Sequence, residues 1–154
     1  SYMGAGCDKL TTISNLSFPA ATNGTYVFQN CTALKKVDGL SLPKATNISY
    51  LFSGCKVLEE VLNIDISSST SSAYVVRDIK TLKRFTISPN ATRCPSFSLL
   101  NCGLDREGMV EFFNSLPSGG STAITITGNP CVKDKSLTDS DKAIATGKGY
   151  TLTA

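Results

Sequence analysis

The chain has 154 residues, of which 41% are hydrophobic and 18% charged, and its formal net charge is +3 at pH 7. This length and composition suit one globular domain with its own core and exclude a disordered chain. The basic residues are spread out and no apolar run is long enough to span a membrane, so we expect neither nucleic-acid binding nor membrane insertion.

A repeat of about 24 residues occupies most of the chain. Each copy begins at a tyrosine: Tyr2, Tyr26, Tyr50 and Tyr74. Three copies have 24 residues, the fourth (Tyr74–Ser96) has 23 and is degenerate, and a fifth starts at Phe97 and breaks off after Cys102. Repeats of this period are typical of stacked supersecondary units. We therefore predict a single domain over residues 1–154, a solenoid of about four coils at 2–102 followed by a C-terminal cap at 103–154.

Apolar residues recur at fixed places in each copy and should form continuous columns in one core. The clearest columns are Leu10, Leu34, Leu58 and Leu82; Ile13, Val37, Val61 and Phe85; Leu16, Leu40 and Ile64; Phe18, Leu42 and Ile66; and Phe28, Phe52 and Val76. The segments around Leu34–Leu42 and Leu58–Ile66 are the strand candidates, and Pro-x-Ala-Thr at Pro19, Pro43 and Pro89 should end each strand in a turn. The polar run Ser67–Ser72 is expected to be an exposed, mobile loop.

Five of the six cysteines are interpreted as core thiols. The fifth position after the leading aromatic is Cys7, Cys31, Cys55, Ile79 and Cys102. Because Ile replaces Cys in one copy, the position calls for a buried apolar group, and neighbouring coils lie too far apart for easy disulfide geometry. Cys94 aligns with Ile48 and should also be buried. Cys131 lies outside the repeats and could be free or paired.

The segment after Cys102 predicts a mixed α/β cap. Asp105 can cap a helix whose apolar face ends at Leu116, before Pro117, and a second short helix should cover Lys142–Thr146, with Thr138 or Asp139 as its N-cap. Alternation predicts a strand at Thr122–Thr127, closed by Gly128–Pro130, and a last strand at Tyr150–Thr153. Such a cap would shield the final open coil.

The repeat unit resembles the BspA-like subclass of leucine-rich repeats. Asn47–Cys55 with Leu58–Val61 carries the match most closely, and Tyr26–Cys31 with Leu34–Val37 and Leu42-Pro43 is nearly as close. The tail is similar to caps of bacterial surface proteins and phage tail-associated proteins. The resemblance implies a short leucine-rich-repeat stack of 23–24-residue repeats, an extracellular or cell-surface location, and adhesion to a host protein or glycan. It names no ligand.

Two outward positions per coil, between the Leu and Val columns, are the candidate partner-binding residues. They read Thr11-Thr12, then Lys35, Lys36, Glu59, Glu60, Lys83 and Arg84. Stacked in register, their charges would alternate in sign and attract one another, so a self-neutralising set on a solvated sheet is the favoured interpretation. The alternative is that this sheet face binds a partner.

The tyrosine column, Tyr26, Tyr50 and Tyr74, is expected to pack at the edge of the core, with stacking on sugar rings as a minor hypothesis. Asp139 and Asp141 fit a helix cap better than a Ca²⁺ site, because no further ligands follow. With no histidine, no CxxC pair and no phosphate-binding glycine loop, we expect no enzyme activity, no cofactor and no zinc site.

The sequence thus favours a non-catalytic binding or adhesion module of a bacterial cell-surface or secreted protein. The alternatives are a phage tail or fibre receptor-binding module and a structural spacer. Because the chain opens in phase with the repeat, we expect a processed form or a fragment of a longer protein. An open first coil around Tyr2–Cys7 would then be an adhesive edge, met by upstream repeats or by an end-to-end contact.

Overall fold

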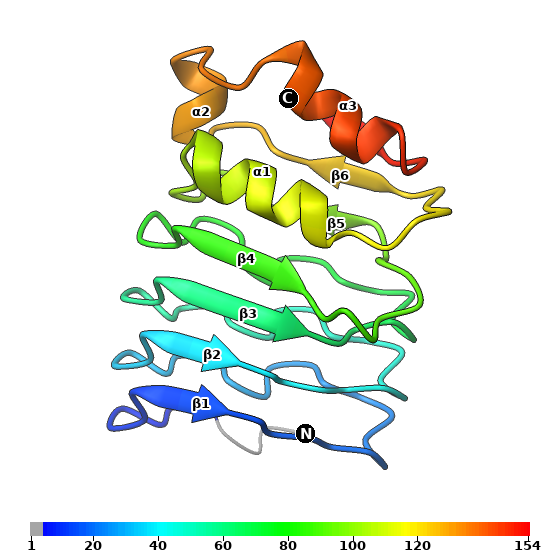
Figure 1. The fold of residues 1–154 in the computed structure, drawn as a ribbon. Coiled ribbons are helices and arrows are strands. Elements are labelled where there is room, and N and C mark those ends of the chain that lie inside the picture. The colour runs from blue at the N-terminus through cyan, green and yellow to red at the C-terminus, as the bar shows by residue number, and fades with distance from the viewer. Residues whose placement is uncertain (1–4) are drawn as a thin grey trace.

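The computed structural model describes residues 5–154, so Tyr2 lies outside the described residues. Four short parallel strands form the first sheet in chain order: β1 (Thr12–Ser14), β2 (Lys36–Asp38), β3 (Glu60–Ile64) and β4 (Arg84–Ile87). Ile13 pairs with Val37, Val37 with Val61, and Val61 with Phe85, so partners are one repeat apart. Each repeat therefore makes one coil of chain, and the coils stack along one axis (Figure 1).

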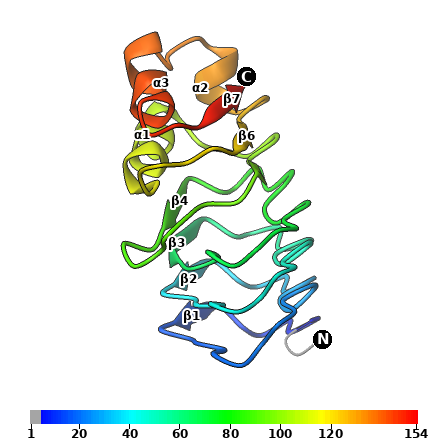
Figure 2. The same cartoon turned by 90° about the vertical axis from the view of Figure 1, so that its right-hand side faces the viewer.

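The strands are shorter than the segments predicted for them. The chain leaves β2 at Gly39 and is irregular within β3 at Asn63, and both residues have positive φ, at 72° and 54°. The register between β3 and β4 shifts between Val61 and Ile64. Isolated parallel bridges continue the stacking beyond the strands, joining Ser17 to Ser41 and Asn23 to Asn47. The turns seen edge-on in Figure 2 are thus hydrogen-bonded to one another on more than one side of the stack.

A column of left-handed residues turns the chain at the same place in each coil. Its members all have φ between 54° and 81°: Gly6, Asn30, Gly54, Asp78, Asn101 and Gly128. Glycine, asparagine and aspartate are the residues that adopt this conformation at least cost. The amide of Asn30 donates to Ser53 O at 2.8 Å and that of Asn101 to Thr127 O at 2.9 Å, so the turns also bind neighbouring coils.

The predicted apolar columns form the core. From the second coil onward their members are almost fully buried, including Leu34, Val37, Leu58, Val61 and Phe85 at 0% exposure. Phe28 stacks on Phe52 with ring centroids 5.9 Å apart. Burial of these side chains contributes about 1.5–3 kcal/mol each, which makes the columns the main source of stability.

The six cysteines are thiols, and five of them are buried. Cys55 Sγ donates to Phe28 O at 3.1 Å and Cys102 Sγ to Val76 O at 2.7 Å. Burial raises the pKa of Cys55, of Cys94 and of Cys102 to about 12, and that of Cys131 to about 11. Cys7 is the exception to the prediction of a buried column, because it lies on the outermost coil and is exposed.

The serine run is not the exposed loop that its composition suggested. Ser69 is fully buried and Ser72 is 9% exposed. Ser68 Oγ donates to Pro43 O at 2.5 Å, and Ser72 Oγ donates to Ser96 O. Short hydroxyl side chains here satisfy backbone carbonyls of neighbouring coils, so the run forms part of the stack.

Helix α1 (Arg106–Ser115) follows β4 on the same face of the stack, where a fifth strand would otherwise lie (Figure 1). Asp105 caps it as predicted, accepting from Gly108 N at 2.9 Å. Ser115 Oγ accepts the amide of Ile87 at 3.0 Å, so the helix satisfies part of the edge of β4. Behind it, β5 (Phe97–Ser98), β6 (Ala123–Thr125) and β7 (Thr151–Thr153) form a second parallel sheet.

Helices α2 (Pro130–Lys133) and α3 (Asp139–Thr146) complete the C-terminal end. The capping box predicted at Thr138 is present, with Asp141 N donating to Thr138 Oγ1 at 3.1 Å. Arg106 makes two bonds of 2.8 Å to Asp141, which join α1 to α3 and, with the Thr138 bonds, hold the pKa of that carboxyl well below its usual range. The segment predicted only to close a strand instead begins α2, because Pro130 is preorganised for the first turn of a helix.

Candidate partner-binding face

An inner charge ladder runs up the first sheet, formed by Lys36, Glu60, Arg84 and Glu111. Lys36 Nζ lies 3.0 Å from Glu60 Oε2, and Arg84 Nη1 lies 3.4 Å from Glu60 Oε1. Arg84 Nε donates to Glu111 Oε2 at 2.8 Å, and its Nη2 contacts Glu111 Oε1. The first three residues are directly opposite one another on neighbouring strands, as the repeat register predicted. The inner ladder is therefore self-neutralising, which was the favoured interpretation of the sequence.

These contacts set the charge states of the ladder. The bond from Lys36, with a smaller contribution from Arg84, lowers the pKa of Glu60. The bond from Arg84 lowers the pKa of Glu111, and the same bond raises the pKa of Arg84. All four groups therefore stay ionised at neutral pH, and each is partly exposed, so the ladder contributes to stability modestly.

Acid should remove part of this stability. A carboxyl whose folded pKa lies below its ordinary value of 4.5 stabilises the fold above that pH, and the contribution is lost as the pH falls through the lower folded pKa. We expect Arg84→Met to lower the free energy of unfolding by about 1 kcal/mol at pH 7 and by much less at pH 3. Urea unfolding at both pH values measures this, and Lys83→Met is the matched control. An equal effect of Arg84→Met at both pH values would contradict the ladder.

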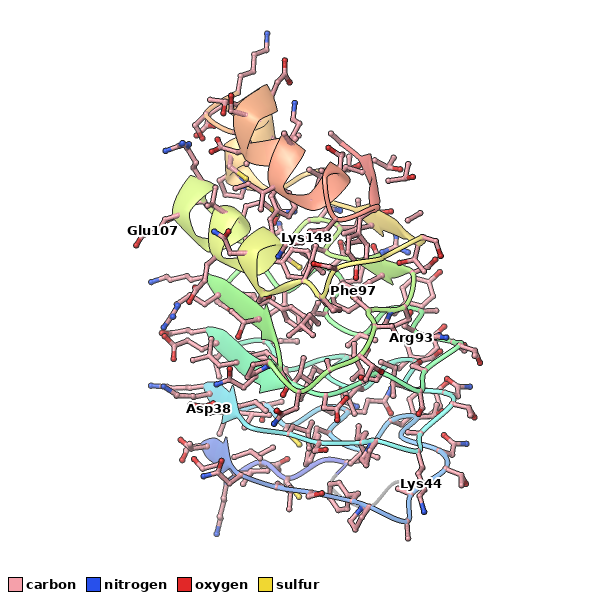
Figure 3. All side chains as sticks on the ribbon, turned by 45° about the vertical axis from the view of Figure 1, so that its right-hand side comes forward. Asp38, Lys44, Arg93, Phe97, Glu107 and Lys148 are labelled. Carbon is pink, nitrogen blue, oxygen red and sulfur yellow. The ribbon has the colours of Figure 1, made fainter. Side chains whose placement is uncertain are left out.

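An outer column of charges lies beside the inner ladder, formed by Lys35, Glu59, Lys83 and Glu107. Each residue follows the previous one by 24 positions, and all four are exposed. The amides of Lys35, Glu59 and Lys83 bond to carbonyls one coil earlier, at 2.9, 2.9 and 2.8 Å, so the backbone fixes their spacing. Glu107 points outward from α1 (Figure 3). Among residues 5–154, none of the four side chains forms an ion pair.

Two hollows flank the upper end of the inner ladder. One of about 600 Å³ lies between β4 and α1, beside Lys83, Asp105 and Glu107. The other, of about 430 Å³, is lined by Leu62, Asn63 and Thr86, among others. Arg84, Glu111 and Asn114 line both, so the Arg84–Glu111 pair stands between two open grooves on the face that carries the outer column.

The structure separates the six predicted residues into two groups. Lys36, Glu60 and Arg84 are engaged with one another, whereas Lys35, Glu59 and Lys83 are exposed. The sequence interpretation missed Glu107 and Glu111. Continuing the 24-residue count from Lys83 would have found Glu107, but Glu111 lies on a helix whose spacing breaks that count.

The tyrosine column packs face to face. Ring centroids are 5.0 Å apart for Tyr26 and Tyr50 and 4.9 Å for Tyr50 and Tyr74. The guanidinium of Arg77 lies over Tyr74, 4.7 Å from its ring centroid. Both faces of the Tyr50 and Tyr74 rings are therefore covered, which leaves only ring edges for a sugar. All three tyrosines have φ near 60°, which the sequence pattern did not indicate.

Searches of the described residues for other site types were negative. Residues 5–154 contain no group of three or more Cys, Asp or Glu side chains placed to hold a metal ion. In the same range, no helix is long and apolar enough to cross a membrane. No protein-family model matches the chain, and comparisons with curated proteins and with solved structures also gave no match.

Proposed function

We propose that the chain is a short leucine-rich-repeat solenoid of the BspA-like kind that acts as a non-catalytic binding module. Its partner is a protein or glycan at a host or neighbouring cell surface, and its setting is a bacterial cell-surface or secreted protein. What supports the architecture is the stacking of 24-residue coils in register. What supports the surface location is the sequence resemblance, which carries no ligand identity.

The observation that carries the binding proposal is the outer column, Lys35, Glu59, Lys83 and Glu107. Four exposed charges of alternating sign stand one coil apart, on backbone positions held by hydrogen bonds. Such preorganised charges can pair with a partner without first breaking internal ion pairs, and the neighbouring grooves give room for side chains to enter. The partner expected on this face carries complementary charges and small side chains or sugar units.

The structural spacer is the alternative that a specific observation favours. The inner ladder already neutralises itself, as expected for a solvated face with no partner. A screen of the intact chain against immobilised glycans and extracellular host proteins separates the two functions. Saturable binding that weakens with added salt is expected of the binding module. The absence of binding throughout such a screen is expected of a spacer and would count against the proposal.

A further inference from the structure

The first coil exposes apolar side chains that the same columns bury completely one repeat later. Four of its side chains are only partly buried: Leu10, Leu16, Phe18 and Ala21. Their counterparts in the second coil are all at 0% exposure: Leu34, Leu40, Leu42 and Ala45. A hollow of about 300 Å³ also opens here, lined in part by Phe18, Ala21 and Val27. The first coil therefore presents half of a coil–coil interface that is complete elsewhere in the stack.

Strand β1 lacks the usual protection of an edge strand. It is the terminal strand of the first sheet, and no strand within residues 5–154 pairs with its outer side. Thr11 O and Asn15 N bond toward β2, at 3.3 Å to Lys36 N and 2.8 Å to Asp38 O. Because backbone groups alternate along a strand, those of Thr12 and Ser14 point to the open side. Edge strands commonly carry charges that prevent pairing, yet β1 is the only strand of this sheet without one.

The opposite end of the stack cannot supply the missing half. There the core is covered by α2 and α3, with Cys131, Ala145 and Tyr150 buried beneath them. A second copy therefore has only one open coil to offer, which is its own first coil. Contacts between identical surfaces close about a two-fold axis and produce a dimer, whereas head-to-tail contacts would produce a filament.

We propose that a second copy of this chain docks on the first coil, with β1 pairing antiparallel to β1 of the partner about a two-fold axis. The apolar side chains of the two first coils then cover one another, and the four-stranded sheets join into one. With the axis perpendicular to the sheet, both outer columns face the same side. The dimer would thus display two copies of the candidate binding face, which raises avidity for a multivalent partner.

Analytical ultracentrifugation of the intact chain, up to about 100 μM, tests this proposal. We expect twice the 16.3 kDa of one chain. Thr12→Lys/Ser14→Lys should give a folded monomer, because both positions are exposed and like charges would oppose one another across the axis. Thr151→Lys/Thr153→Lys adds the same charge at exposed positions of β7 and should leave the dimer intact. Circular dichroism checks folding of both variants.

Three results would overturn the proposal. A wild-type chain that stays monomeric would leave the first coil as the docking surface of a different segment. A dimer that survives Thr12→Lys/Ser14→Lys would place the contact elsewhere. Dissociation caused equally by the β7 variant would show that added charge alone, and not the position on β1, breaks the dimer.

Discussion

Replacing Asn129 by leucine is expected to lower the free energy of unfolding by about 3–5 kcal/mol. Asn129 is fully buried, and its Nδ2 donates to Leu99 O at 2.8 Å and to Ile126 O at 2.7 Å. Its Oδ1 accepts the amide of Leu104 at 3.2 Å. Leucine has a similar size but leaves these three backbone groups unsatisfied. They belong to the ends of β5 and β6 and the entry to α1, so the loss should destabilise the whole cap.

Urea unfolding monitored by circular dichroism measures this loss, with Asn114→Leu on the exposed face of α1 as the matched control. The control should change stability by less than about 0.5 kcal/mol. Asn129→Asp keeps the acceptor and loses both donors, so it should also destabilise the fold. Equal, small effects of Asn129→Leu and Asn114→Leu would show that the buried amide does not hold the cap together.

Replacing Gly108 by alanine is expected to destabilise the fold by about 2 kcal/mol or more, although alanine is intrinsically the better helix former. A Cβ on Gly108 would lie 2.1 Å from the carbonyl oxygen of Lys83. That oxygen belongs to the backbone just before β4, so no side-chain rotation relieves the clash and α1 must move away from the sheet. The movement would also disturb the Arg84–Glu111 contact at the groove.

Thermal and urea unfolding of Gly108→Ala should be compared with Asn114→Ala, in the same helix but exposed. The control follows helix propensity and should be neutral or slightly stabilising. Stabilisation by Gly108→Ala would mean that propensity outweighs the close approach, and that α1 does not pack against the start of β4 as described.

The repeat made the core predictable because burial recurs with the chain's own period. Once Leu34, Val37 and Leu42 are aligned with their counterparts, each column follows, and the structure confirms their burial. Helix ends were predictable for a local reason, since the capping residues Asp105 and Thr138 act within three positions of the groups that they bind.

Features that depend on contact between distant segments were not predictable in this way. The left-handed φ of Tyr26, Tyr50 and Tyr74 has no sequence signal, because aromatic residues seldom adopt it. Gly108 was read only as a weak point in a helix, since its reason is the passing carbonyl of Lys83. At the candidate site the repeat brought Lys36, Glu60 and Arg84 together, but it could not show which charges remain unpaired.

The central claim is that the outer column, Lys35, Glu59, Lys83 and Glu107, binds a partner. The most direct test inverts the column with Lys35→Glu, Glu59→Lys, Lys83→Glu and Glu107→Lys together, which keeps the net charge. Titration against a partner identified in the screen should show affinity reduced by about tenfold or more, with thermal stability unchanged. The control is Lys44→Glu, exposed on the far side of the stack (Figure 3). Unchanged affinity in the inverted variant would contradict the claim.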